Sequence, residues 1–571
     1  METPSDTQAP PIGAAPGSMA ALAVTASAIG ATSSKLEKVR LLAAYLRTLD
    51  PQRLPVATRY FAGRPFPSGD TRVLQIGGAA LSTVLRELTG IDGDALSRIY
   101  RRHADAGDTT HDALLEAGRG GTGGLDLVGV AAAFDTIAAG GTPRQRAGLL
   151  RELLAGCSPE EARYIVKLIS GDMRIGLREG LVEEAIGRAF DRPATAVARA
   201  DMIIGDLGEV ALLARDDRLD DAQPRLFAPM RYMLASPVSG AAEVITRLGD
   251  EVWVEDKYDG IRCQLHRDAG RVLLCSRDLK DITEQFPEVV RAARRVEGAL
   301  LLDGELLAFR ERRVLPFAAL QTRLGRKRPP PQLLAEVPVV FVAWDLLFQD
   351  GESLLEQPLR ARRERLEALG LGDGFALAHL ERARGVDALE QLFLDARARR
   401  NEGLMAKDPD SAYTPGRRGL AWLKLKKPLD TLDVVVIGAE WGHGKRHGVL
   451  SDVTFAVRVD GSDELVPVGK AYTGLTDAEI AEMTAMLLER TVSEHGSYRT
   501  VRPDIVLEVA FDAVQRSARH RSGFALRFPR ILRWRRDKPP EEIDTLSRVR
   551  AIAEQLAEGP EQRVDPATAE A

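Results

Sequence analysis

The sequence predicts a multidomain protein with an all-α N-terminal domain, a mixed α/β central domain and a small β-barrel near the C-terminal end. The chain has 571 residues, enough for several domains of about 150 residues each. Apolar residues recur at helical spacing in the first third of the chain and in short β-rich runs afterwards. The composition, 44% hydrophobic and 28% charged, excludes a disordered or collagen-like chain.

The helical domain is expected from 19 to 222, after a flexible tail at 1–18. In 34–47, apolar residues recur every three or four positions with charges between them, as on an amphipathic helix. The run Ser158-Pro159-Glu160-Glu161 indicates another helix start, because it supplies an N-cap, a proline at the first helical position and acids in the first turn.

The central α/β domain is expected at 223–428. Strand-like runs such as 300–309 and 337–347 alternate there with helical stretches such as 385–400. From 429 to 556, strand-like runs recur around Gly-rich turns, a pattern typical of a small β-barrel. Residues 557–571 are polar and are expected to form a second flexible tail.

Charge and cysteine content narrow the function classes. The formal net charge of -5 does not by itself indicate a polyanionic partner, but 515–538 is locally basic and could bind an anion. Cys157, Cys263 and Cys275 contain no Cys-x-x-Cys pair, which excludes a disulfide framework and a four-thiolate zinc site and favours a reducing cytoplasm. The uncharged stretch 7–34 lacks a basic n-region and a long apolar run, so neither a signal peptide nor a membrane partner is expected.

The sharpest chemical signal is Lys257-Tyr-Asp-Gly-Ile-Arg262, which follows one strand-like run and precedes another. Strand alternation puts Glu255 and Lys257 on one face, so that an acceptor and an amine share the same space. A deprotonated lysine is a nucleophile, and burial beside another cation favours that form. The alternative is an ordinary surface turn.

Three companion segments strengthen this signal. Asp303 and Glu305 share a face of an apolar strand, where they could bind a metal or a ribose or form a structural ion pair. The run from Asn401 to Lys407 adds another acid, Glu402, and another lysine. Lys424 and Lys426 alternate with leucines, as a phosphate clamp or a solvated edge strand would.

Together, these segments resemble in order and spacing the motif series of the covalent nucleotidyltransferases, which include polynucleotide ligases and messenger-RNA capping enzymes. More closely, the chain resembles an ATP-dependent DNA ligase, with Arg527-Phe-Pro-Arg530 and Arg535-Arg-Asp-Lys538 near its end. The resemblance implies a helical DNA-binding domain, a nucleotidyltransferase (adenylation) domain and an OB-fold. It also implies nick sealing in DNA replication, repair and recombination, through a lysyl-AMP intermediate.

The resemblance also assigns roles. Lys257 is expected to attack the α-phosphate of ATP, Glu255 to accept a hydrogen bond from adenine, and Arg262 to contact ribose or the nick phosphate. The remaining residues expected to bind the nucleotide are Arg277, Glu305, Trp344, Arg418, Lys424 and Lys426. Glu305 and Glu402 are expected to hold Mg²⁺, and Asp537 and Lys538 to form a mobile last motif that orients pyrophosphate. Contacts to nicked duplex DNA are expected from Lys445, Arg446, Arg516, Arg527 and Arg530.

Two positions depart from the family pattern: Trp344 stands where phenylalanine usually stacks on adenine, and Asp278 where asparagine is frequent. Phe341 is a less favoured stacking candidate.

For the basic stretch, a solvated strand or salt bridges within the domain remain the alternative. A capping guanylyltransferase, an RNA ligase and an NAD-dependent DNA ligase fit the chain less well, and a catalytically silent nick-binding clamp is the alternative from another class. A monomer in the cytoplasm, associated with the nucleoid, is expected.

Overall fold

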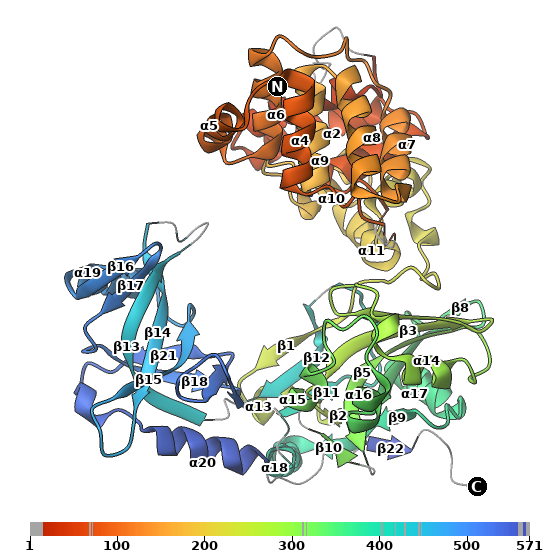
Figure 1. Ribbon diagram of the computed structural model, residues 1–571. Helices are drawn as coiled ribbons and strands as arrows, with labels where there is room; N and C mark the ends of the chain where they lie inside the picture. Colours follow the sequence, from red (N-terminus) through yellow and green to blue (C-terminus); the bar gives the residue numbers. More distant parts are fainter. Residues whose placement is uncertain are drawn as a thin grey trace, which may run out of the picture.

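In the computed structural model, the described residues are 15–67, 70, 72–310, 313–315, 317–399, 401, 403–416, 418–426, 430–442, 446, 448–557 and 564–566. Figure 1 shows a helical body above two strand-containing bodies, which lie side by side beneath it. This order of helical, mixed and strand-rich parts confirms the predicted fold class. Within the described ranges, no helix is both long and apolar enough to cross a membrane.

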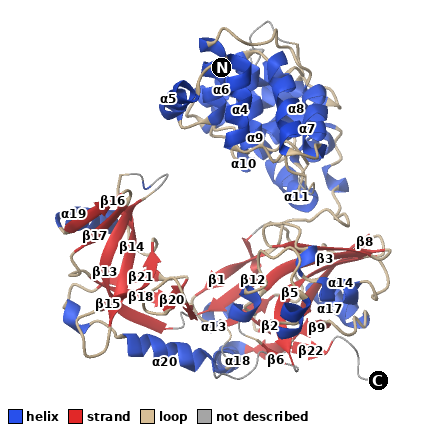
Figure 2. Ribbon diagram, in the orientation of Figure 1, coloured by secondary structure: helices blue, strands red, loops and turns tan. Residues whose placement is uncertain are grey.

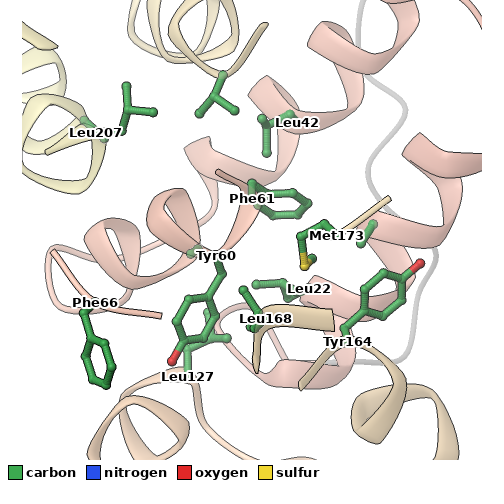
Figure 3. Close-up of a cluster of buried hydrophobic side chains, with 14 of the residues drawn as sticks. Leu22, Leu42, Tyr60, Phe61, Phe66, Leu127, Tyr164, Leu168, Met173 and Leu207 are labelled. Atoms are coloured by element: carbon green, nitrogen blue, oxygen red, sulfur yellow. The ribbon is translucent and has the colours of Figure 1, made fainter. Parts of the chain in front are cut away.

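The first body contains only helices and connecting loops in its described part (Figure 2). Ser158 is the N-cap of one of these helices, as predicted, and the structure adds a capping box in which its side chain and that of Glu161 satisfy each other's backbone N–H groups. Aromatic and aliphatic side chains fill the centre of the body (Figure 3). The helices are α1 (Met19–Ala31), α2 (Lys35–Arg47), α3 (Arg53–Phe61), α4 (Gly78–Thr89), α5 (Gly93–His103), α6 (Ala106–Glu116), α7 (Leu127–Ala139), α8 (Pro143–Gly156), α9 (Pro159–Ser170), α10 (Glu179–Phe190), α11 (Ala194–Ile204), α12 (Leu207–Arg215) and η1 (Leu219–Asp221).

The central body is built on two sheets. The larger has the strand order β22-β9-β7-β5-β3-β4 and the smaller β1-β12-β11-β2-β10. The strands are β1 (Leu234–Val238), β2 (Glu251–Asp256), β3 (Ile261–Asp268), β4 (Arg271–Ser276), β5 (Leu300–Arg310), β6 (Arg313–Val314), β7 (Val339–Gln349), β8 (Glu352–Ser353), β9 (Phe375–Ala378), β10 (Leu380–Arg384), β11 (Gly403–Lys407), β12 (Arg418–Lys426) and β22 (Val564–Pro566). The helices are α13 (Ala241–Leu248), η2 (Thr283–Gln285), α14 (Pro287–Ala293), α15 (Phe317–Gln321), α16 (Pro331–Glu336), α17 (Leu359–Ala368) and α18 (Gly385–Ala398).

Two features of this body position the candidate site. Strand β2 lies in the smaller sheet and β3 in the larger, so residues 257–260 cross from one sheet to the other. Strand β22 comes from the stretch 557–571, where the sequence predicts a flexible tail. It pairs antiparallel with β9, through Val564–Ala378 and the two pairs that follow.

The third body is rich in strands, as predicted for 429–556. Its long first strand, β13, pairs with β14, β17 and β18. The elements are β13 (Asp430–Trp441), β14 (Leu450–Arg458), β15 (Leu465–Ala471), α19 (Asp477–Glu489), β16 (Thr491–His495), β17 (Tyr498–Val501), β18 (Val506–Phe511), β19 (Ala513–Arg516), β20 (Phe524–Arg527), β21 (Arg530–Trp534), η4 (Pro540–Glu542) and α20 (Leu546–Ala557). The domain boundaries given above remain predictions.

One buried group in the central body makes its stability depend on pH. His266 on β3 is fully buried, its Nδ1 accepts a hydrogen bond from the Phe227 N–H at 3.2 Å, and burial lowers its pKa to about 3. Below about pH 6.5 the unfolded chain therefore binds a proton that the folded chain excludes. The contribution of His266 to the free energy of unfolding is expected to fall by about 1.4 kcal/mol per pH unit, or about 2 kcal/mol between pH 6.5 and pH 5.

Denaturant unfolding at pH 7 and pH 5, followed by tryptophan fluorescence, measures this effect. On lowering the pH from 7 to 5, the free energy of unfolding of His266→Gln should change by about 2 kcal/mol in the stabilising direction relative to the wild type, because glutamine does not titrate in this range. His495→Gln, at an exposed position on β16, is the matched control and should leave the difference unchanged. Equal pH dependence in the wild type and His266→Gln would contradict the assignment.

Candidate functional site

Lys257 lies directly after β2, where the chain leaves the smaller sheet. Its backbone N–H donates to the Gly403 carbonyl on β11 at 3.0 Å, which ties the segment to the neighbouring strand. Gly403 has a φ of 151°, and an added Cβ would lie 2.1 Å from the Leu425 carbonyl on β12. This backbone packing leaves no room for a side chain at position 403, so the strand beside Lys257 approaches β12 closely.

A group of cations surrounds Lys424 on β12. Burial lowers the pKa of Lys424, and the nearby charges of Arg418, Lys426, Lys257 and Arg277 lower it further. Lys424 and Lys426 are partly exposed whereas the intervening leucines are buried, as the alternation predicts. Because β12 lies between β1 and β11, the alternative of a solvated edge strand is wrong.

Glu305 on β5 faces the same group. It is 9% exposed, and its Oε1 accepts a hydrogen bond from the Gly260 N–H at 3.1 Å. Burial raises the pKa of Glu305 to about 8, and the positive charges of Lys257 and Arg262 oppose this rise. Such a buried carboxylate gains from an additional cation, which would compensate for its lost hydration.

Asp303, two residues earlier, has a different environment. It is fully buried and binds the Arg262 guanidinium with both oxygens, at 3.1 and 2.7 Å, while the Tyr413 hydroxyl donates to it at 2.8 Å. Arg262 also donates to the Met233 carbonyl at 2.9 Å. The structural ion pair considered for Asp303 and Glu305 therefore applies to Asp303, and its partner is Arg262.

Sequence reasoning missed the partner of Glu255. This carboxylate is 4% exposed and forms an ion pair of 2.5 Å with Nζ of Lys407, whose side chain is also buried. Lys407 Nζ lies 4.4 Å from the ring centre of Trp422 and 5.7 Å from that of Trp344. Strands β2 and β11 pair antiparallel, which places the two charged side chains together. The acid and the lysine in 401–407 mark this segment in the sequence. The sequence does not show, however, that the strand containing Lys407 pairs with the strand containing Glu255.

Trp344 on β7 is half-buried. The guanidinium carbon of Arg262 lies 5.5 Å from the centre of its ring. Its indole nitrogen is buried and has no hydrogen-bond partner within the described residues. Phe341 is fully buried and packs edge-on against Phe375 at 5.9 Å. Phe341 therefore belongs to the core, and Trp344 is the better placed of the two for stacking against a planar ligand.

The third body contacts this region through two ion pairs. Lys426 Nζ lies 2.6 Å from Asp512, which also binds Arg530 at 3.3 Å. Arg527 lies 3.0 Å from Asp259, two residues after Lys257. Two arginines predicted to contact DNA are thus held by carboxylates here, one within the third body and one across the two bodies.

The other predicted residues are spread over the third body. Lys538 and Arg535 both bind Asp433, at 2.7 and 2.9 Å, and Asp537 binds Arg535. The predicted last motif is therefore anchored on β13 and is not drawn to the cation group by any of these contacts. Arg516 is exposed at the end of β19, and Arg446 donates to the Tyr472 carbonyl. Glu402 and Lys445 lie outside the described residues.

The arrangement combines an amine, several cations and a buried carboxylate around the crossing between two sheets. Cations of this kind neutralise the charge of a polyphosphate, and the carboxylate suits a divalent cation carried by one. Within the described residues, no group of three or more His, Cys, Asp or Glu side chains could hold a metal by itself. The site is therefore suited to phosphoryl-type transfer, in which positioning and charge neutralisation dominate.

Comparison with protein families gives three consecutive matches. Residues 18–187 match the model described as DNA ligase N terminus, and residues 232–426 match the ATP dependent DNA ligase domain. Residues 446–538 match the ATP dependent DNA ligase C terminal region. The three matches follow the order of the three bodies.

Individual proteins agree with this result. A probable DNA ligase of Koribacter versatilis is 44% identical over 94% of this chain and 96% of its own length. A probable DNA ligase of Opitutus terrae is 44% identical over 95% of this chain, which spans only 63% of that longer relative. The solved structure described as Pmar-Lig_PreS3 covers 90% of this chain and 99% of its own, with a TM-score of 0.55 and 15% identity, and so supports the fold alone.

Proposed function

Because this chain belongs to the family of ATP-dependent DNA ligases, whose general function is nick sealing through a covalent adenylate, we propose that it performs this reaction with Lys257 as the adenylated residue. The observation that supports this most is the group formed by Lys257, Lys424, Arg418 and Arg277 beside Glu305. An amine beside a polyphosphate-binding cation group is the arrangement that nucleophilic attack on phosphorus requires.

In the first step, the Lys257 nitrogen bonds to the α-phosphorus of ATP as the bond to pyrophosphate breaks. The amine loses a proton and AMP remains as a phosphoramidate. Lys424, Arg418 and Arg277 neutralise the charge that develops on the departing pyrophosphate. Trp344 stacks on the base, and Glu255, fixed by Lys407, accepts from its amino group.

In the second step, an oxygen of the 5′-phosphate at the nick attacks the AMP phosphorus and the bond to Lys257 breaks. In the third, the 3′-hydroxyl attacks the 5′-phosphate, forms the phosphodiester and releases AMP. The basic residues Arg446, Arg516, Arg527 and Arg530 bind the phosphates of the nicked duplex, whereas Arg262 stays paired with Asp303. Since phosphates carry no sequence information, sealing is independent of sequence.

Mg²⁺ is the cofactor that suits this site besides ATP. Glu305 offers a buried carboxylate with one backbone hydrogen bond, and Mg²⁺ is usually held by one or two carboxylates together with substrate phosphates. Glu402 is the second predicted ligand. When bound, the ion supplies Lewis-acid polarisation of the phosphate oxygens. The monomeric state and the cytoplasmic, nucleoid-associated location stay predictions.

Sealing of a nicked duplex across ATP, NAD and GTP tests the proposal. We expect ligated product with ATP, none with NAD and less with GTP, each with Mg²⁺ present. A duplex whose nick carries a 5′-hydroxyl is the control, because it offers no acceptor for AMP and should stay unsealed. Binding of nicked DNA without sealing by any nucleotide would support the silent clamp and overturn the proposed activity.

The Glu255–Lys407 pair predicts a specific defect in nucleotide binding. Lys407→Met leaves the Glu255 carboxylate buried without its cation, which is expected to lower stability by about 3–5 kcal/mol. The misplaced carboxylate should raise the ATP concentration for half-maximal self-adenylation about tenfold or more, with a smaller effect on the rate at saturating ATP. ATP titrations of adenylate formation measure both quantities.

The double variant Glu255→Gln/Lys407→Met is the matched control. It removes both charges, so it should be more stable than Lys407→Met alone, because no uncompensated charge remains buried. Stability of the double variant at or below that of Lys407→Met would contradict a direct pairing of these residues.

A further inference from the structure

The C-terminal strand β22 belongs to the sheet of the central body, although the helix before it belongs to the third body. Val549 and Ile552 of α20 pack in the apolar core of the third body, and Arg548 binds Asp430 at 2.6 Å. Seven positions after Ala557, the chain enters the central sheet at Val564. In Figures 1 and 2, α20 runs beneath the third body toward the central one, where β22 lies close to β9.

The strand covers an edge that would otherwise be exposed. β9 pairs with β7 on one side, and all four of its residues, from Phe375 to Ala378, are buried. Without β22, this apolar strand would present unpaired backbone groups at the end of the sheet, as an aggregation-prone edge does. The pairing of Val564 with Ala378 and of Asp565 with Leu377 satisfies this edge from within the chain.

Side chains connect β22 to the residue next to the proposed nucleophile. Val564 packs against a buried cluster that contains Tyr258, Val342 and Ala378, and Trp344 packs on the same cluster. Asp565 Oδ1 lies 2.7 Å from Nδ1 of His379. The backbone N–H of His379 in turn donates to the Tyr258 hydroxyl at 3.0 Å.

Tyr258 is therefore packed against a residue of β22, and it directly follows Lys257 in the chain. A displacement of Tyr258 would move the backbone that carries Lys257, and small displacements of reacting groups have large effects on rate. We propose that the C-terminal strand Val564–Pro566 is a positioning element of the adenylation site, which holds Tyr258, and through it Lys257, in the geometry for attack on ATP. This proposal rests on the proposed function of Lys257.

Two full-length variants test the strand. Val564→Asp places a carboxylate against the apolar cluster of Tyr258, and Asp565→Asn removes the charge beside Nδ1 of His379 while Glu381 stays beside Nε2. Val492→Asp, at a valine 66% exposed on β16, and Asp463→Asn, at a fully exposed aspartate, are the matched controls. Hydrogen exchange at residues 376–378 reports directly on whether β22 stays paired with β9.

Single-turnover self-adenylation separates positioning from simple loss of folded protein. For Val564→Asp we expect a rate constant about tenfold lower, an unchanged amplitude, and less than about a twofold change in the half-saturating ATP concentration. Asp565→Asn should lower the rate constant about threefold, and both variants should exchange faster at 376–378 than their controls.

A rate constant equal to that of the controls, despite faster exchange at 376–378, would overturn the proposal. A loss of amplitude alone would also overturn it, since that result describes a structural role only. Either outcome leaves the proposed function intact as long as the label depends on Lys257. Label that persists in Lys257→Arg would instead remove the proposed function itself.

Discussion

Lys257→Arg should acquire no covalent label from ATP carrying a radioactive α-phosphate, whereas the wild-type chain acquires an acid-labile label. Attack on the α-phosphorus needs a neutral nitrogen with an available electron pair. A guanidinium stays protonated at any pH that a protein tolerates, and its electron pairs are delocalised. The side chain keeps its positive charge in this variant, so the surrounding cations and Glu305 meet a similar electrostatic environment. Loss of label is therefore expected from the chemistry and not from a disturbed site.

A second measurement keeps this result interpretable. Closure of a nick that already carries AMP on its 5′-phosphate forms no bond to Lys257, so Lys257→Arg should retain this step if it is folded. Lys35→Arg, at an exposed lysine of α2, is the control and should be labelled like the wild type. Covalent label on Lys257→Arg would show that another residue carries the adenylate.

The sequence predicted those parts of the site that depend on local order. Lys424 and Lys426 share a face because side chains alternate along a strand, and this holds whatever lies beside the strand. Asp303 and Glu305 are two positions apart on a strand, so the sequence likewise predicted that they share a face of the sheet. Helix starts were predictable because they also depend on local order, as Ser158 at the N-cap and Pro159 after it illustrate.

Contacts between distant strands were not predictable in this way. Glu255 and Lys407 meet because β2 pairs with β11, although the two residues are 152 positions apart and the sequence between them does not indicate the register. Arg262 could have faced a ligand phosphate as well as Asp303, and only the adjacent strands β3 and β5 decide the matter. The strand β22 is shorter still: three residues carry too little pattern to indicate pairing with β9.

The basic stretch shows where composition alone misleads. Arg521, Arg533 and Arg536 bind Glu464, Glu508 and Glu482 of the same body, so the alternative of salt bridges within the domain holds for these three. Exposed ion pairs of this kind contribute little free energy and exchange readily with other partners. These arginines can therefore leave their carboxylates and bind phosphates at a small cost in free energy. Arg262 cannot leave Asp303 in this way, because that ion pair is buried.

Withholding Mg²⁺ should abolish self-adenylation in the wild-type chain. The triphosphate brings several negative charges to a site that already contains Glu305. In the proposed site, these charges are neutralised by three cationic side chains, Lys424, Arg418 and Arg277. Burial raises the pKa of Glu305 to about 8, which reports how poorly the ionised carboxylate is compensated without a further cation. With EDTA present, label should be absent at any ATP concentration, and added Mg²⁺ should restore it.

Glu305→Gln tests whether Glu305 is a ligand of the required Mg²⁺. Glutamine still accepts the hydrogen bond from the Gly260 N–H but carries no charge, so the Mg²⁺ concentration for half-maximal labelling should rise about tenfold or more. Glu352→Gln, at an exposed carboxylate on β8, is the matched control and should titrate like the wild type. Equal Mg²⁺ titrations for Glu305→Gln and the wild type would exclude Glu305 as a ligand. Labelling at full rate in EDTA would exclude the metal from the first step, and the cation group around Lys424 would then have to neutralise the triphosphate alone.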